Sequence, residues 1–112
     1  MPLIKVRTTL AANGTSFPLQ GNQYEFLPFD ALVEFAILGD AAAVVNASVF
    51  SGSDVLQQES QIDDLAVANP ILYPDHYSLQ DVAAAGERLG VSLTEAAGAT
   101  PIVRTNVRIT PL

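Results

Sequence analysis

The chain of 112 residues carries twelve acidic and five basic side chains, a formal net charge of −7, and no cysteine. This length predicts one domain, residues 1–112, around a single core. The missing cysteine excludes disulfides and thiolate chemistry. The negative charge argues against binding nucleic acid through its phosphates. Because the apolar stretches are too short for a membrane span, we expect a soluble protein with no membrane partner.

The N-terminal third begins with a clear strand pattern and then becomes irregular. Apolar residues alternate with polar ones over residues 4–10, which is typical of a half-buried strand. Asn13-Gly14 indicates a turn. Prolines and glycines interrupt residues 17–28, where we expect irregular backbone with a short strand over 24–27.

The middle of the chain contains the strongest hairpin pattern. Residues 31–38 predict a central strand, since apolar side chains dominate and a Gly-Asp pair ends the run. Residues 45–49 and 55–62 predict two further strands, and the turn residues between them indicate a hairpin. A short helical turn is expected over 65–69.

The C-terminal third predicts three more strands. Residues 76–82 form the first, and residues 83–86 predict a corner, because four residues ending in glycine are too few to nucleate a helix. Residues 89–93 and 103–109 alternate cleanly, with a turn expected at Gly98. We expect these last two strands to form a second hairpin.

The sum of these patterns predicts an all-β protein. About eight short strands, with turn residues every ~8–12 positions, favour an antiparallel β-sandwich or a jelly-roll-like barrel. No crossover helix is visible, which argues against a parallel α/β architecture.

Acidic and basic residues occupy different parts of the chain. All twelve acids lie between Glu25 and Glu95, while four of the five basic residues lie outside that stretch. If the first and last strands pair, these four would form one basic ribbon on an outward face. Such a ribbon suits contact with a like copy or an acidic partner. The predicted interface residues are Lys5, Arg7, Arg104 and Arg108.

The residues that carry chemistry are few. The single histidine, His76, follows Asp75, but cupin-type metal sites on jelly rolls use two or three histidines. A turn histidine hydrogen-bonded by Asp75 is the simpler interpretation. We therefore predict no catalytic residues, no cofactor, no metal site and no enzymatic activity.

Aromatic residues raise an alternative function. Stacking of sugars on exposed aromatic rings would suit a carbohydrate- or ligand-binding β-sandwich, with Tyr73, His76 and Tyr77 as its ligand loop. The competing interpretation is core packing or subunit contact. The other aromatic residues in question are Phe17, Tyr24, Phe26 and Phe29.

Three runs of the sequence are distinctive: DVAAAGERL at residues 81–89, VRITPL at residues 107–112 and FSGSDVL at residues 50–56. They resemble small all-β capsid decoration or cement proteins of bacteriophages, and more loosely single jelly-roll coat proteins, and the resemblance covers roughly residues 24–112. It implies a homo-oligomer, often a trimer, that binds the major capsid protein and stabilises an icosahedral shell. The expected location is the virion, and the family offers no catalytic residues to carry over.

Overall fold

A computed structural model describes residues 3–39, 45–52, 54–64, 69–73, 75–95 and 101–112. Within them the chain forms strands and no helix, which confirms the predicted all-β class. The strands are β1 (Leu3–Thr9), β2 (Thr15–Ser16), β3 (Ala31–Gly39), β4 (Val45–Ser51), β5 (Asp54–Gln61), β6 (Asp63–Asp64), β7 (Leu79–Ala83), β8 (Leu89–Glu95) and β9 (Ile102–Pro111).

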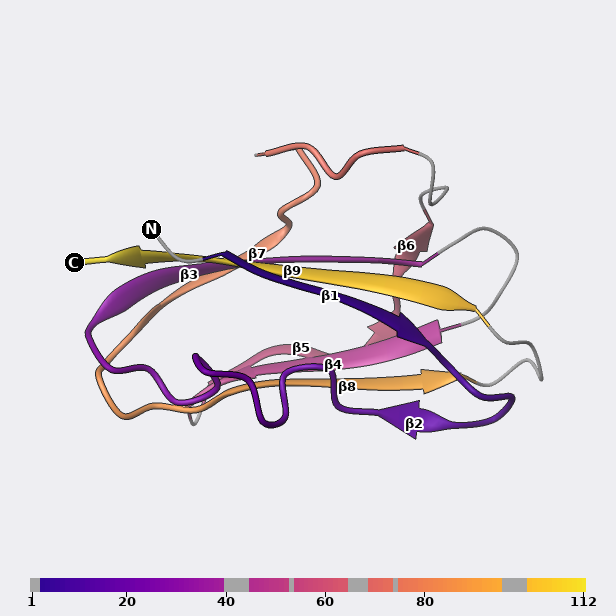
Figure 1. Ribbon diagram of the computed structural model, residues 1–112, viewed down its shortest axis with the longest axis horizontal. Helices are drawn as coiled ribbons and strands as arrows, with labels where there is room; N and C mark the ends of the chain where they lie inside the picture. Colours follow the sequence, from indigo (N-terminus) through magenta and orange to yellow (C-terminus); the bar gives the residue numbers. More distant parts are fainter. Residues whose placement is uncertain (1–2, 40–44, 53, 65–68, 74, 96–100) are drawn as a thin grey trace.

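The strands form two layers (Figure 1). In the first sheet the order is β1-β9-β3, with β7 antiparallel to one half of β3 and the short β6 parallel to its other end. The second sheet has the order β2-β8-β4-β5. Leaving β6 aside, this strand order is that of a jelly roll, in which two Greek keys fold into two packed sheets. The two sheets do not close into a barrel. The predicted antiparallel β-sandwich is therefore confirmed, and the predicted barrel is not.

Period-two alternation explains how the core forms. Along β8, residues at odd positions are buried and those at even positions are half-buried. The strand β3 is central in its sheet and is buried along nearly its whole length, so both of its faces are covered. Phe35 at its centre is fully buried, and the apolar inner faces of both sheets contribute to one core cluster.

Two predicted strand pairings have different outcomes. β4 and β5 form the predicted hairpin, although the register shifts twice along it. The predicted hairpin of the last two strands is wrong, because β8 lies in the second sheet and β9 in the first. Both strands have the same alternation, which says that each has a buried face but not which strand lies beside it.

Smaller differences concern strand bounds. The strand expected over residues 24–27 is only an isolated bridge between Phe26 and Arg88, and the strand expected over 76–82 begins at Leu79. The turns expected at Asn13-Gly14 and over 83–86 are present, with positive φ at Asn13 and Gly86. The expected helical turn over 65–69 falls largely outside the described residues, and the turn at Gly98 falls wholly outside them.

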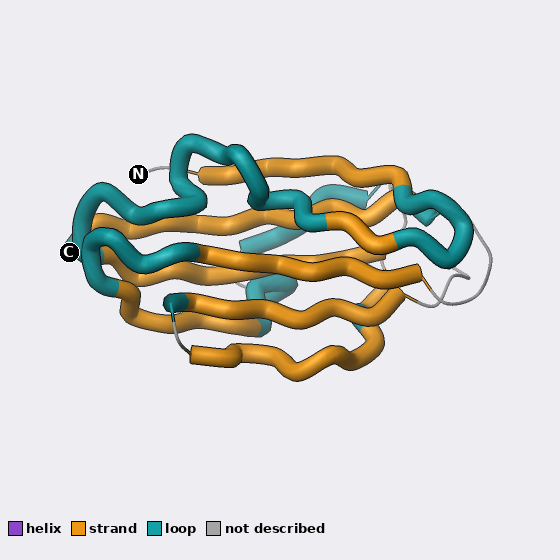
Figure 2. Tube along the Cα trace, turned by 90° about the horizontal axis from the view of Figure 1, so that it is seen from below, coloured by secondary structure: helices purple, strands orange, loops and turns teal. Residues whose placement is uncertain are grey.

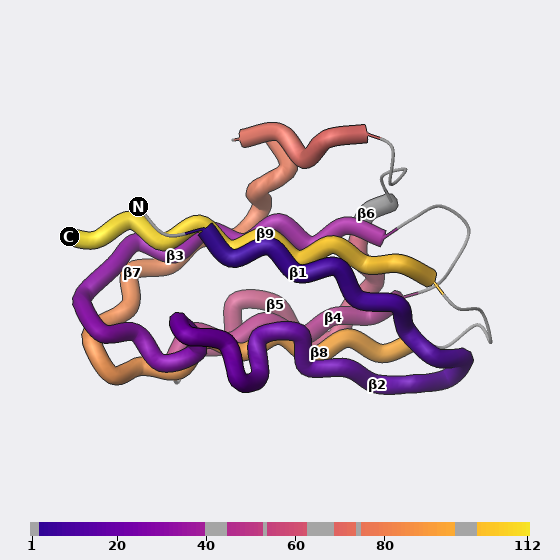
Figure 3. Tube along the Cα trace, viewed as in Figure 1, coloured from indigo at the N-terminus to yellow at the C-terminus, as the bar shows by residue number. Residues whose placement is uncertain are grey.

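The loops lie at the ends of the sandwich (Figure 2), and one connecting segment covers a sheet face (Figure 3). Seen from below, the strands of both layers run along the long axis, and loops gather at the ends (Figure 2). The segment leading into β7 lies over the first sheet, on the side away from the second sheet (Figure 3). This segment therefore covers a sheet face that the core does not use.

Candidate functional site

The first and last strands pair, as the ribbon hypothesis requires. β1 and β9 are antiparallel neighbours, with Lys5 opposite Asn106 and Arg7 opposite Arg104. Lys5 and Arg7 are exposed, whereas Arg104 and Arg108 are half-buried on the same outward face. The backbone thus brings together four of the five basic residues of the chain. Their use as an interface remains a prediction.

The segment over this face is attached to the basic residues. Arg104 Nη1 donates a hydrogen bond of 2.7 Å to the carbonyl oxygen of Asn69. The guanidinium carbon of Arg108 lies 3.8 Å from the centre of the Tyr73 ring, within the range of a cation–π interaction. These contacts come from β9 and hold the segment against the first sheet.

Tyr73 also contacts the acid nearest to the ribbon. Its hydroxyl donates to Glu34 Oε1 over 3.4 Å, and Glu34 lies opposite Arg108 in the pairing of β3 with β9. Glu34 is buried although it belongs to the outward face. The ring of Tyr77 packs edge-to-face on Tyr73, with ring centres 5.4 Å apart. Tyr73 therefore connects a cation, an acid and a second aromatic ring.

Between the segment and the sheet lies a cleft of about 610 Å³, a size common among ligand sites. All four predicted interface residues line it, together with two residues of the predicted ligand loop. The residues around the cleft are Leu3, Lys5, Val6, Arg7, Pro70, Ile71, Tyr73, Tyr77, Arg104, Asn106 and Arg108. We call this site the basic cleft.

The third residue of the predicted ligand loop has a different place. His76 does not line the basic cleft. Its Nδ1 accepts a hydrogen bond of 2.8 Å from the Leu72 backbone N–H, and the backbone N–H of His76 donates to the Leu72 carbonyl. His76 thus closes a local turn with Leu72, rather than with its neighbour Asp75.

Sequence reasoning missed one residue of the cleft and two contacts beside it. Asn106 could have been found, since it lies two positions from both Arg104 and Arg108 on β9 and must share their face. The contacts of Arg104 with Asn69 and of Tyr73 with Glu34 could not, because they depend on how the covering segment folds back.

The chemistry of the cleft is that of anion binding. Arg7 and Arg104 are direct cross-strand partners, and Lys5 and Arg108 line the same cleft. A carboxylate or another oxyanion could accept charge-assisted hydrogen bonds from the exposed cations Lys5 and Arg7. Apolar and aromatic groups on the cleft wall suit a ligand that also has an apolar part.

The described residues form neither a metal-binding cluster nor a membrane-spanning helix. Among the described residues, no three side chains of His, Cys, Asp or Glu gather as a metal site would require. None of the described segments forms a helix long and apolar enough to cross a bilayer.

The fold and the cleft together define a jelly-roll β-sandwich with a basic, tyrosine-walled cleft outside one sheet. No protein family model matches the chain, and neither a curated protein nor a solved structure does so.

Proposed function

We propose that this chain is a non-enzymatic structural subunit, a decoration or cement protein of a bacteriophage capsid, and that its basic cleft binds an acidic segment of a neighbouring shell protein. The observation that carries the proposal is the concentration of four of the five basic residues in one walled cleft of a chain with net charge −7. In such a chain, a local positive site selects acidic partners and orients their approach.

The architecture supports this proposal at the level of analogy. Jelly rolls occur in viral capsid subunits, in lectins and in cupins. A fold does not define a function, so the cleft must choose among these classes. Its cations favour an acidic partner. Its apolar wall, which includes Pro70 and Ile71, favours a peptide over a bare phosphate.

Binding of an acidic peptide tests the cleft directly. A fluorescent peptide rich in glutamate, with one aromatic residue, should bind the wild-type chain, and Arg104→Glu with Arg108→Glu should abolish binding. Because Arg108 also holds Tyr73, the milder pair Lys5→Glu and Arg7→Glu provides a variant at exposed positions. Equal binding by wild type and both variants would refute the proposed cleft.

Co-sedimentation with purified phage shells tests the biological partner. The wild-type chain should sediment with shells that lack their own decoration protein, and the Lys5→Glu, Arg7→Glu variant should stay in solution. If the chain binds the acidic peptide but no shell, the cleft binds acidic segments as proposed, and the capsid is not its partner.

A carbohydrate-binding module is the second candidate. The observation that favours it is Tyr73, a cleft residue that is 51% exposed. Aromatic faces of this kind stack on sugars, and the cations would select acidic sugars such as uronates. A glycan array decides between the two candidates. A carbohydrate-binding module should bind a glycan that competes with the acidic peptide, whereas a shell-binding subunit should bind none.

A further inference from the structure

A second surface lies on the other sheet, away from the basic cleft. Three phenylalanines are exposed there, Phe17 by 56%, Phe26 by 59% and Phe50 by 37%. Phe50 belongs to β4, whereas the other two lie in the long connection between β2 and β3. Exposed aromatic residues that gather in one place usually mark an interaction site. We call these three residues and Arg88 the aromatic patch.

The patch contains a hollow. Its volume is about 250 Å³, and Phe17 and Phe50 line it together with Leu19. Phe50 lies close against Gly90 of β8, since a Cβ built on that glycine would be 3.4 Å from the Phe50 ring. The Phe50 ring therefore lies beside Gly90 on the sheet, and both residues line the hollow.

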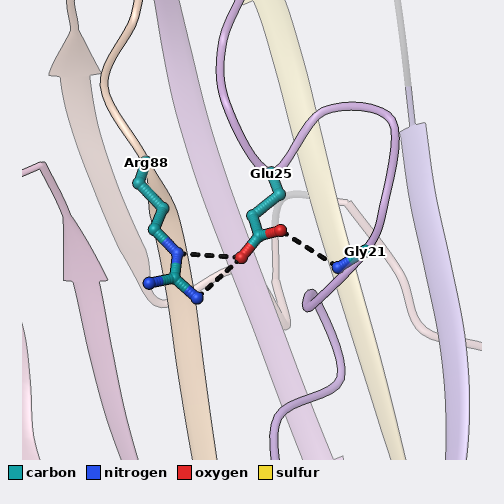
Figure 4. A network of polar contacts seen from close by, with 3 residues as sticks. All are labelled: Gly21, Glu25 and Arg88. Atoms are coloured by element: carbon teal, nitrogen blue, oxygen red, sulfur yellow. Dashed lines mark hydrogen bonds and ion pairs between the residues drawn. The ribbon is translucent and has the colours of Figure 1, made fainter.

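Arg88 and Glu25 compensate each other within the patch. Arg88 donates from Nε to Glu25 Oε2 over 2.8 Å, and its Nη2 lies 2.8 Å from the same oxygen. The other oxygen of Glu25 accepts from the Gly21 backbone N–H over 3.0 Å (Figure 4). The guanidinium carbon of Arg88 lies 5.8 Å from the centre of the Phe26 ring. The pair adds no net charge to the patch, while the Glu87 side chain lies against Gly52 at the edge of the hollow.

The low charge of the patch points to the occupant. Copies of a chain with net charge −7 repel each other through their acids. At the patch, two copies bring together mainly aromatic rings and a compensated ion pair, with Glu87 at its edge. The patch also carries both halves of a contact, because the exposed Phe26 ring stands beside the hollow, with Arg88 between them.

We propose that the aromatic patch binds a second copy of this chain, with Phe26 of each copy inserted into the hollow of the other. Such a contact uses the same patch on both copies, as a two-fold symmetric dimer does. Aromatic and arginine side chains are those that most often dominate protein interfaces. The contact deepens the proposed function by giving the expected homo-oligomer its surface. It leaves the basic cleft open, so the two proposals can fail separately.

Sedimentation velocity of the full chain over a range of micromolar concentrations tests the contact. The wild-type chain should form a closed dimer. Phe26→Asp should raise the dissociation constant by at least about tenfold, the loss expected when an interface anchor is removed. Val82→Asp is the matched control, since Val82 is 63% exposed on β7 of the other sheet and the change adds the same charge.

A second variant guards against a folding defect. Phe17→Asp changes the other side of the hollow, and it should reproduce the effect of Phe26→Asp while the thermal unfolding transition of both variants stays cooperative. A wild-type chain that remains monomeric would overturn the proposal. Equal weakening by Val82→Asp would do the same, as would growth into chains of unlimited length.

Discussion

At the scale of single residues, one buried hydroxyl offers a direct test of the core. Thr105 on β9 is fully buried and faces inward between Val6 and Ile37, and its Oγ1 has no hydrogen-bond partner among the described residues. A buried polar group without a partner destabilises the folded state by about 1–3 kcal/mol. Thr105→Val should therefore raise the free energy of unfolding by about 1 kcal/mol and the melting temperature by about 4 °C.

Differential scanning calorimetry of Thr105→Val beside Thr9→Val makes the comparison. Thr9 is exposed at the end of β1, so the same change there should leave the melting temperature within about 1 °C of the wild type. Equal shifts in the two variants would show that β-propensity, and not the buried hydroxyl, decides the result.

Glu25 gives a second prediction at this scale, through pH. The hydrogen bond from the Gly21 N–H, with help from Arg88, lowers the pKa of Glu25 below its ordinary value of 4.5. A carboxylate with a lowered pKa stabilises the folded state above its ordinary pKa, and this contribution is lost as the pH falls through the lowered value.

Denaturant unfolding between pH ~7 and pH ~3 measures this contribution. Glu25→Gln should lose less stability over that range than the wild type does, because its amide cannot be protonated there. Glu59→Gln, at an exposed site on β5, should follow the wild type. The idea fails if the Glu25→Gln and Glu59→Gln curves coincide.

At the scale of elements, the pairing of β1 with β9 separates stability from function. Arg7 faces Arg104 across these strands, so Arg7→Glu replaces a repulsive pair with an attractive one. The variant should gain about 0.2–1 kcal/mol of stability while its affinity for the acidic peptide falls. Arg7→Gln is the control, because it removes the repulsion without adding an acid. Loss of stability in Arg7→Glu would contradict the inferred geometry of the ribbon.

The same elements show what the sequence could predict. Alternation identified the outward face of each basic residue correctly, because the side-chain period of a strand is two wherever the strand lies. It did not identify neighbours, and so it joined β8 to β9 when β9 in fact lies between β1 and β3. The cleft could not be predicted from the sequence either. Its wall depends on Tyr73 contacting Arg108, a tertiary contact that no local pattern records.

At the scale of the whole molecule, ionic strength should separate the two proposed surfaces. The basic cleft attracts acidic partners through charge, and salt screens that attraction over a distance that falls from about 30 Å at 0.01 M to about 10 Å at 0.1 M. The aromatic patch joins copies that each carry a net charge of −7, so salt screens a repulsion there. Peptide affinity should therefore fall along the same salt series in which self-association stays constant or strengthens.

Fluorescence anisotropy of the acidic peptide and sedimentation velocity of the chain, both in the same buffers, measure the two responses. Phe26→Asp should keep the salt dependence of peptide binding, and Arg7→Glu should keep that of self-association, since each variant changes only one surface. If both equilibria weaken together as salt rises, the copies associate through charged groups. The basic cleft of one copy would then contact the acids of another, and the aromatic patch would lose its proposed partner.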